Sequence, residues 1–377
     1  MEKIVVATDS FKGSLSSRDA GMAVSAGVSR ALPGSQVQVI AVGDGGEGTV
    51  EALTEALGAS PVSCRAHGPL MEICEVPYAV SADGGTAVLE IAAAAGLTMV
   101  PPGRRNPLYT STYGVGEAIA DALRRGVRRF LIGLGGSSTN DAGAGMLSAL
   151  GYRFYDASGC AVRALCGQDL SGIARIDPAH SAPELAETQF IVACDVDNPL
   201  YGPRGAAYVF GPQKGASYSD VAALDLGLRQ FSEAMVASGY DEVCDLPGAG
   251  AAGGLGAAFA GILGGRMRRG IDIVLDAVGF ADRVEGASLV ITGEGRIDAQ
   301  TIMGKTPAGV LEAAAKKGIP VMAIGGSVEA GTQLPGFVSI VQATPPGMTL
   351  SEAMKSDVAR RNIEEAAFRA IKEYYKL

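Results

Sequence analysis

The stretch Gly133–Gly145 reads GLGGSSTNDAGAG and decides the fold that we predict. It follows the apolar segment 129–134, which predicts a buried strand, and precedes Met146–Leu150, which predicts a helix. A glycine- and hydroxyl-rich turn between a strand and a helix points backbone N–H groups at one spot, which suits phosphate. The alternative is a structural turn in which Asn140 or Asp141 caps the helix. Similar turns elsewhere in the chain favour the phosphate site.

One such turn lies near the N-terminus. Residues 4–7 predict a strand, 9–14 a loop, and Ser16 is expected to cap the following helix, with Asp19 three residues further on. Ligands collect at such loops, because the carboxyl ends of parallel strands share one edge of the sheet. Lys12 in this loop either binds an anion or faces solvent as an ordinary surface lysine.

A second strand is predicted at 37–42, and the loop 43–48 after it spaces three glycines like a dinucleotide-binding fingerprint. The acid expected roughly twenty residues later is missing around Gly68, which argues against NAD. Asp44 and Glu47 would repel a pyrophosphate, but they suit a magnesium ion or a substrate hydroxyl.

The sequence pattern changes from about residue 61, where short segments of β-forming residues begin. The β-formers in 73–80 and 86–91, with a hairpin turn at 83–85, indicate the start of a second domain inserted into the first. A helix is expected at 115–123. The region 151–187 shows no clear pattern.

Two acids follow the next predicted strand, 190–193. Asp195 and Asp197 suit a divalent cation, or one metal ligand beside a general base, although a solvated turn is the alternative. Arg204 and Lys214 come shortly afterwards and would supply positive charge for an anionic substrate or nucleotide.

The last charged loop, 293–301, is expected after a strand at 288–292. Glu294, Arg296 and Asp298 crowd both signs of charge into it, which is costly unless they face water, one another or a ligand.

The triplet Gly304–Thr306 reads GKT, but it is no Walker A loop, because the required earlier glycine is Ala299. Late strands are predicted at 321–324 and 338–341, and amphipathic helices at 350–375.

Composition narrows the function classes. The 377 residues leave room for two or three domains, and a net charge of −9 argues against a nucleic-acid partner. The N-terminus lacks the apolar core of a signal peptide, and the uncharged run 246–265 is too rich in glycine for a membrane span. The six cysteines form no C-x-x-C pair, so we expect a reduced, cytoplasmic compartment without a zinc site.

Loops that combine glycine, carboxylates and nearby cations supply what phosphoryl transfer needs: donors and cations for phosphates, acids for magnesium, and a group that positions the attacking hydroxyl. Dehydrogenation does not explain so many acids. Hydrolysis has little support, because no G-x-S-x-G nucleophile motif is present.

Seven motifs follow one another along the chain: DSFKGS (9–14), GDGGEGT (43–49), NPL through STYG (106–114), GGSSTND (135–141), ACDVDNPL (193–200), FGPQKG (210–215) and ITGEGRID (291–298). Together and in this order they resemble those of the bacterial glycerate kinase family, which acts in glyoxylate, glycolate and sugar-acid breakdown.

The resemblance implies an α/β protein of two α/β domains, with the active site in the cleft between them. A Rossmann-like parallel-sheet domain would be formed by both chain ends, 1–62 and 286–377, and a second α/β domain, 63–285, would be inserted. It also implies ATP and Mg²⁺ as co-substrates and D-glycerate as acceptor, phosphorylated at the 2-hydroxyl, with the 3-hydroxyl as the alternative. The oligomeric state stays open, and a homodimer is one option.

Residue roles follow from loop chemistry combined with these motif positions. Asp195 is expected to accept or orient the glycerate hydroxyl proton and to bind metal with Glu294, while Lys12 and Arg296 bind the glycerate carboxylate or the transferring phosphoryl group. The residues assigned to glycerate are Ser10, Asp44, Asp197 and Asn198, with Asp44 also a metal ligand and Asp197 a metal ligand or supporting acid. Those assigned to the nucleotide are Gly135, Gly136, Ser137, Ser138, Thr139, Asn140 and Lys214.

Two other classes remain open at this stage. One is a dinucleotide-dependent oxidoreductase that uses the glycines of 43–48. The other is a two-lobed binding protein for a sugar acid, which would bind its ligand without consuming ATP.

Overall fold

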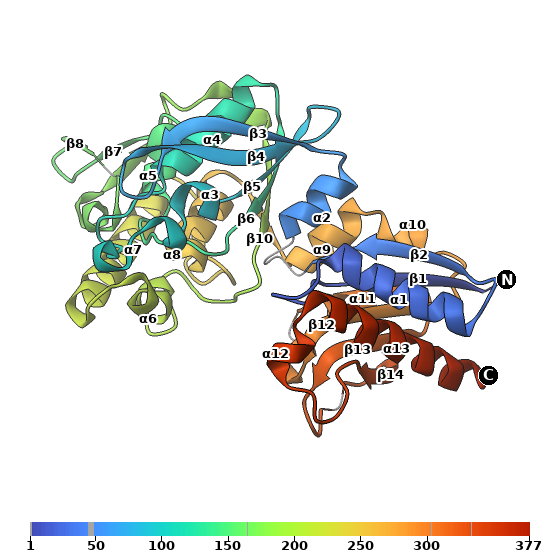
Figure 1. The fold of residues 1–377 in the computed structure, drawn as a ribbon. Coiled ribbons are helices and arrows are strands. Elements are labelled where there is room, and N and C mark those ends of the chain that lie inside the picture. Colours follow the sequence, from blue (N-terminus) through green and yellow to red (C-terminus); the bar gives the residue numbers. More distant parts are fainter. Residues whose placement is uncertain (1, 44–48, 164, 303, 333) are drawn as a thin grey trace. The chain divides into compact units, whose positions relative to one another are not determined.

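The computed structural model describes residues 2–43, 49–163, 165–302, 304–332 and 334–377. Contacts within the chain divide it into two compact units, each of which is treated by itself. Unit 1 comprises Met1–Leu57 and Arg269–Leu377, and unit 2 comprises Gly58–Arg268 (Figure 1). The predicted fold class is confirmed: both chain ends build one α/β unit with a parallel sheet, and a second α/β unit is inserted.

Unit 1 is built on a sheet in the order β2-β1-β12-β13-β14, in which every neighbouring pair is parallel. The chain leaves β1 toward β2 on one side, and the later strands add on the other side, so the strand order reverses between β1 and β12. Ligands of open parallel sheets bind outside the carboxyl ends of the strands at such a reversal. The strands are β1 (Lys3–Thr8), β2 (Gln36–Ala41), β12 (Leu289–Ile297), β13 (Val321–Val328) and β14 (Phe337–Gln342).

Helices cover both faces of this sheet, which explains why Ile4–Ala7 in β1 are fully buried. One face packs against α1 (Ser17–Ala31) and α13 (Ser356–Tyr375), which also contact each other. α1 begins as predicted, because the Ser16 side chain accepts a hydrogen bond from Asp19 N–H. The remaining helices are α2 (Thr49–Ala56), α9 (Gly270–Ala277), α10 (Phe280–Arg283), α11 (Thr306–Ala315) and α12 (Leu350–Ala353).

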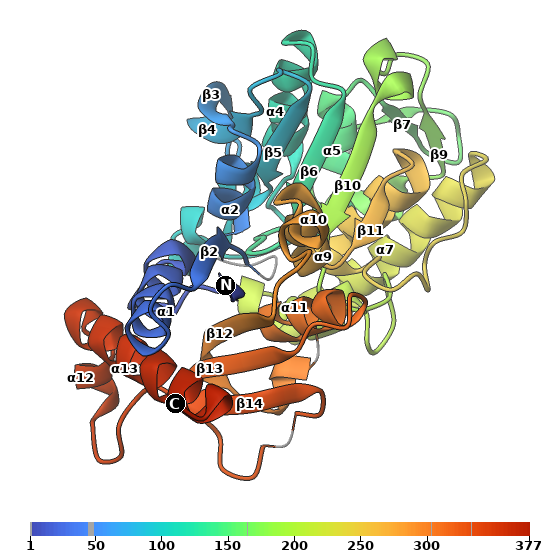
Figure 2. The same ribbon diagram turned by 90° about the vertical axis from the view of Figure 1, so that its right-hand side faces the viewer.

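Unit 2 is built on a mixed sheet in the order β3-β4-β5-β6-β10-β11. The four strands from β5 to β11 are parallel and lie side by side in Figure 2, whereas β3, β4 and β5 form antiparallel pairs, with the predicted hairpin turn between β4 and β5. The bounds are β3 (Ser60–His67), β4 (Ile73–Val80), β5 (Thr86–Glu90), β6 (Arg129–Gly133), β10 (Gln189–Ala193) and β11 (Arg266–Arg268).

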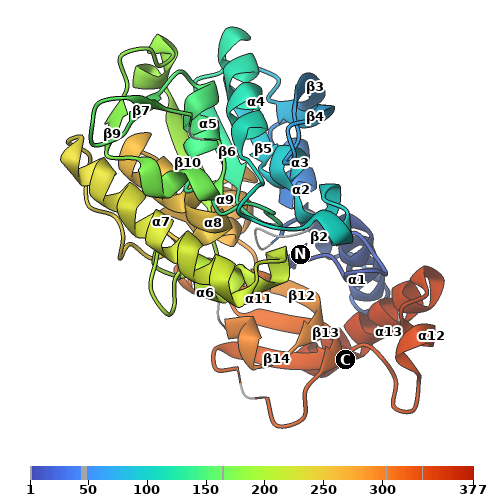
Figure 3. The same ribbon diagram turned by 90° about the vertical axis from the view of Figure 1, so that its left-hand side faces the viewer.

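One face of the unit 2 sheet carries α4, α5 and α7 (Figure 3). The helices are α3 (Ala92–Ala95), α4 (Tyr113–Arg124), α5 (Ala144–Ala149), α6 (Ala206–Phe210), α7 (Tyr218–Ala237) and α8 (Ala251–Ala257). The region 151–187 contains a small separate sheet of β7 (Arg153–Tyr155), β8 (Ala161–Val162) and β9 (Arg175–Asp177). Within the described part of the chain, none of the helices has the length and apolar character to cross a membrane.

Two of the elements that differ from the sequence-based expectation are the strands β3 and β12. β3 was not predicted, because Ser60–His67 alternates weakly and takes its partners from β4. β12 continues to Ile297, so Glu294 and Arg296 lie in a strand and the loop prediction for them is wrong. The extension arises because β13 runs beside it, with Arg296 opposite Ser327.

Close packing of α4 on α5 provides a test of the fold. A Cβ atom at Gly116 would lie 2.2 Å from the Met146 carbonyl oxygen and 2.8 Å from the Ala149 Cβ. We expect Gly116→Ala to destabilise unit 2 by about 1–3 kcal/mol, because overpacking outweighs the roughly 1 kcal/mol that alanine gains in a helix. Thermal unfolding measures the effect. Gly103→Ala, whose Cβ would meet nothing within 4 Å, is the control; equal unfolding midpoints for the two variants would contradict the packing.

Candidate active site

A pocket in unit 1 lies where β1 and β12 end, at the reversal of strand order. The predicted residues Ser10, Lys12, Glu294 and Arg296 all line it. Ser10 and Lys12 follow β1, whereas Glu294 and Arg296 belong to β12. These residues from opposite ends of the sequence share one site because β1 and β12 pair directly, with Thr8 opposite Gly293. Asp44 lies outside the described residues.

Asp9 fixes the loop after β1. One carboxylate oxygen accepts a hydrogen bond of 2.6 Å from Ser10 N–H, and the other accepts one of 2.8 Å from the Thr306 hydroxyl. The Asp9 backbone N–H donates to the Gly293 carbonyl oxygen at 2.8 Å. This buried acid therefore ties the first loop to the start of α11 and to β12. Its two side-chain hydrogen bonds indicate that it positions the pocket.

Glu294 is a second buried carboxylate of the pocket, with 8% of its surface exposed. Burial raises its pKa to about 6, and the charges of Asp9 and Asp298 act in the same direction. The hydroxyl of Thr301 donates to it at 2.7 Å, and Lys305 Nζ lies 3.8 Å from its second oxygen. Both oppose this rise without cancelling it, and with a pKa of about 6 Glu294 is largely ionised at neutral pH and can hold a cation.

Two cations stand beside these acids. Lys305 Nζ lies 3.7 Å from an Asp298 oxygen, and Arg296 Nε lies 3.4 Å from the other. Arg296 also pairs at 3.3 Å with Glu329, but its side chain remains 63% exposed. Because these distances are long for hydrogen bonds, the cations can reorient toward an anionic ligand.

Lys305 is a pocket residue that the sequence analysis missed. Its triplet Gly304–Thr306 was considered only as a Walker A loop and set aside. The glycine at 304 was the sequence signal that could have located Lys305 at a helix start. In the structure Gly304 has a left-handed φ of +95°, and α11 begins at Thr306.

A second cluster lies in unit 2, in the loop after β6. Gly135 and Gly136 at its tip are exposed, whereas Ser137, Ser138, Thr139 and Asn140 are buried. Ser138 donates from its N–H and its hydroxyl to the Ala95 carbonyl oxygen. The loop is therefore held from behind, and only its glycine tip faces solvent.

Lys214 provides the main support for this loop. Its ammonium donates to the Ser137 hydroxyl oxygen and to the Thr139 carbonyl oxygen, both at 2.7 Å. The side chain is buried, and this burial lowers the pKa of Lys214 to about 7 although the Asp141 carboxylate opposes the shift. In this conformation Lys214 therefore stabilises the loop by hydrogen bonds from the protein interior.

Asp141 explains how the helix after the loop begins. Its carboxylate accepts hydrogen bonds from the N–H groups of Gly143 and Gly145, and the Thr112 hydroxyl accepts one from Met146 N–H. The structural-turn alternative thus holds for Asp141: these amides at the start of α5 already donate within the protein. A phosphate would have to meet the glycine tip of the loop instead.

Among the residues that the structure describes, the side-chain amide of Asn140 and the hydroxyl of Thr139 are buried and find no hydrogen-bond partner. Unpaired buried polar atoms are costly, so these two side chains are candidates for pairing with a bound water or ligand.

The third group follows β10. Asp195 and Asp197 are exposed, and Asp197 pairs with Arg204 at 3.3 Å. The Asn198 side-chain amide donates to the Arg204 carbonyl oxygen at 2.8 Å, which closes the loop on itself. Asp195 is thus presented on an ordered turn at the carboxyl end of a parallel strand.

A magnesium ion fits the residues of the unit 1 pocket. No group of three or more acids, histidines or cysteines surrounds a common point among the residues that the structure describes. Mg²⁺ does not need such a cage, because it is usually held by one or two carboxylates together with substrate phosphates and water. Glu294, one of whose oxygens lies 3.8 Å from the Lys305 ammonium, would supply such a carboxylate.

Comparisons with known proteins assign the chain to a family. A sequence profile of the glycerate kinase family matches residues 4–375. The chain belongs to the glycerate kinase family. Within it, the glycerate kinase of Halalkalibacterium halodurans is 43% identical over 96% of this chain and 97% of its own. The glycerate 2-kinase of Escherichia coli is 44% identical over 86% and 85%.

A solved structure shows that the similarity extends to the fold. This family member superposes on a protein from Salmonella typhimurium LT2 described as a glycerate kinase 2, with a TM-score of 0.89 and 41% identity. The superposition covers 100% of this chain and 98% of the Salmonella chain. Like its relatives, this glycerate kinase family member is an enzyme with a mixed α/β fold.

The buried lysine predicts a pH effect on stability. Because folding lowers the pKa of Lys214 from 10.5 to about 7, the unfolded chain binds more protons between these values, and wild-type stability gains with rising pH. Relative to Lys214→Met, we expect the wild type to gain of the order of 1–2 kcal/mol between pH 7 and 9. Denaturant unfolding at both pH values measures this. The same substitution at exposed Lys316 is the control, and a pH-independent difference at Lys214 would refute the assignment.

Proposed function

We propose that this enzyme transfers the γ-phosphoryl group of ATP to the 2-hydroxyl of D-glycerate with the help of Mg²⁺. The observation that carries the proposal is the unit 1 pocket, where Glu294, Lys305, Arg296 and Lys12 gather at the reversal of strand order. Family membership supports glycerate as acceptor, and the relative from Escherichia coli named glycerate 2-kinase supports the 2-position.

In unit 1, the proposed roles follow from charge. Lys12, Arg296 and Lys305 neutralise the anionic groups of the phosphoryl donor and of glycerate, where guanidinium favours two-point contact. Ser10 contributes a hydroxyl to glycerate beside them. Glu294 would hold the magnesium ion, which neutralises charge that develops on the phosphate oxygens.

In unit 2, Asp195 acts on the attacking hydroxyl. As the 2-oxygen of glycerate bonds to the γ-phosphorus, the bond from that phosphorus to the bridging oxygen breaks, ADP leaves, and the Asp195 carboxylate takes the hydroxyl proton. Asp197 and Asn198 support glycerate on the same turn.

The loop after β6 is proposed to contact nucleotide phosphates through its exposed tip, Gly135 and Gly136. Ser137–Asn140 and Lys214 then hold this tip in shape from within the protein. The reaction therefore needs groups from both units to act on one pair of substrates.

The position of phosphorylation is tested directly by phosphorus NMR. Incubation with D-glycerate, ATP and Mg²⁺ is expected to give ADP and 2-phosphoglycerate, with L-glycerate as the control acceptor. Formation of 3-phosphoglycerate would overturn the 2-position while leaving the kinase assignment intact. Failure to form either product would overturn the acceptor.

The role of Asp195 is tested by Asp195→Asn. Loss of the proton acceptor should lower kcat by about 10²- to 10⁴-fold with little change in the unfolding midpoint. Asp241→Asn, at another exposed aspartate of unit 2, is the matched control. An Asp195→Asn enzyme with unchanged steady-state turnover would remove Asp195 from the mechanism.

A further inference from the structure

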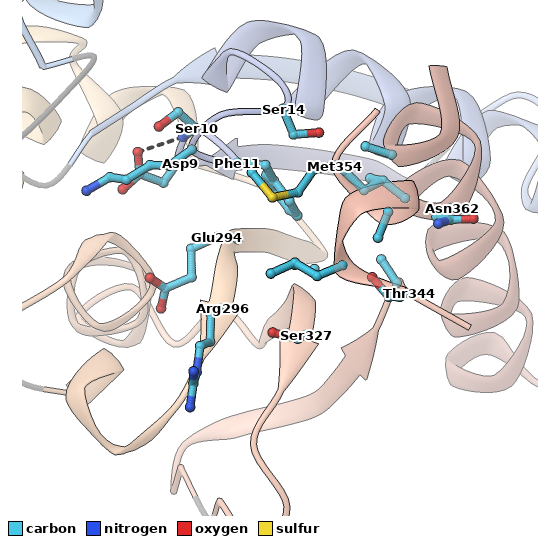
Figure 4. Close-up of a pocket in the computed structure, with 18 of the residues that line it drawn as sticks. Asp9, Ser10, Phe11, Ser14, Glu294, Arg296, Ser327, Thr344, Met354 and Asn362 are labelled. Carbon is cyan, nitrogen blue, oxygen red and sulfur yellow. Dashed lines mark hydrogen bonds between the residues drawn. The ribbon is translucent and has the colours of Figure 1, made fainter. Parts of the chain in front are cut away.

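The unit 1 pocket changes character along its length (Figure 4). Asp9, Glu294 and Arg296 lie at one end and Thr344 and Asn362 at the other, with Met354 between them beside Phe11. The pocket volume is about 320 Å³, and most of its lining surface is apolar. A small, charged acceptor does not account for this second end.

The apolar end is an open surface over a rigid floor. Phe11 and Ile363 form part of the floor and are 5% and 1% exposed, because they belong to the core of unit 1. Leu350 and Met354 line the same space from α12 and its end, yet they are 73% and 40% exposed. Two large apolar side chains thus face a hollow that the rest of the unit does not fill.

Glycines hold this hollow in place. A Cβ atom at Gly326 would lie 2.5 Å from the Gly295 carbonyl oxygen and 3.4 Å from the Phe11 ring. Gly13 has a left-handed φ of +73°, and its Cβ would lie 2.9 Å from the terminal methyl of Met354. Glycine at 326 thus lets β13 lie close to Gly295 and Phe11, whereas at Gly13 it is the left-handed backbone that favours glycine, because the Met354 methyl could move aside.

Glycerate carries oxygen on each of its three carbons, so burying it against leucine, methionine and phenylalanine would leave its polar groups unpaired. A nucleobase has the opposite character, with flat apolar faces and polar edges. Ser327, Thr344 and Asn362 stand at the rim of the apolar end, where they can meet such edges (Figure 4).

We infer that the apolar end of the unit 1 pocket binds the nucleobase of the phosphoryl donor, with Phe11, Leu350, Met354 and Ile363 as its apolar contacts. The phosphates then extend toward Lys305 and Arg296 at the charged end, where the reversal of strand order favours a ligand. This inference rests on the proposed use of ATP. It assigns recognition of the donor's base to unit 1.

The double variant Leu350→Gln/Met354→Gln tests the inference, because both side chains are exposed and the substitutions leave the charge unchanged. Its dissociation constant for ATP, measured by calorimetry without glycerate, should rise at least about tenfold. Tripolyphosphate, which has no base, should bind the variant and the wild type within about twofold of each other. Met22→Gln/Leu377→Gln, at exposed sites of the same unit away from the pocket, is the matched control.

Wild-type affinity of the pocket variant for ATP would overturn the inference. So would an equal loss for ATP and tripolyphosphate, because the substitutions would then act on the phosphate end. A raised Michaelis constant for D-glycerate with unchanged ATP binding would assign the apolar end to the acceptor and also overturn it. If ATP binding depends on Leu350 and Met354 but no phosphoglycerate forms, the nucleobase site stands and the proposed acceptor falls.

Discussion

Parallel pairing of β1 with β12 is the constraint on which the candidate site depends. The two strands come from opposite ends of the chain, and their carboxyl ends meet because Ala7 lies opposite Thr292 and Thr8 opposite Gly293. This register brings the loop of Asp9 beside Glu294. The hydrogen bond from the Thr306 hydroxyl to Asp9 then adds the start of α11, and with it Lys305. One strand pair thereby assembles acids and cations that are far apart in the sequence.

The two clusters illustrate different uses of buried charge. In the unit 1 pocket, Glu294 and Lys305 are separated by 3.8 Å, which leaves the carboxylate accessible to a stronger cation. In unit 2, Lys214 is buried and its ammonium donates to two loop oxygens at 2.7 Å. Its hydrogen bonds therefore stabilise the conformation of the loop. Close hydrogen bonds fix the scaffold, and longer ion pairs leave groups available for a ligand.

Local features were predictable from the sequence, and long-range ones were not. The Ser16 cap and the hairpin at 83–85 depend on neighbouring residues, and both were predicted. The extension of β12 through Glu294 and Arg296 was missed, because these glycine-rich residues resemble a loop until β13 supplies a partner. The burial of Lys214 was also beyond the sequence, since a lysine among glycines usually faces water.

The candidate site shows the same division. Motif positions predicted roles for Ser10, Lys12, Glu294 and Arg296, and all four line one pocket. The apolar end formed by Leu350 and Met354 was read only as part of an amphipathic helix pattern. That these two side chains line a pocket depends on residues distant in the sequence, such as Phe11 and Thr344, which lie on its other sides.

The central claim is that the unit 1 pocket binds the phosphoryl donor at the reversal of strand order. A crystal structure with a non-hydrolysable ATP analogue, Mg²⁺ and D-glycerate tests it most directly. We expect the base against Phe11 and Met354, the phosphates near Lys305 and Arg296, and the cation bonded to Glu294. An analogue whose base and phosphates both contact only unit 2, with D-glycerate in the unit 1 pocket, would contradict the account.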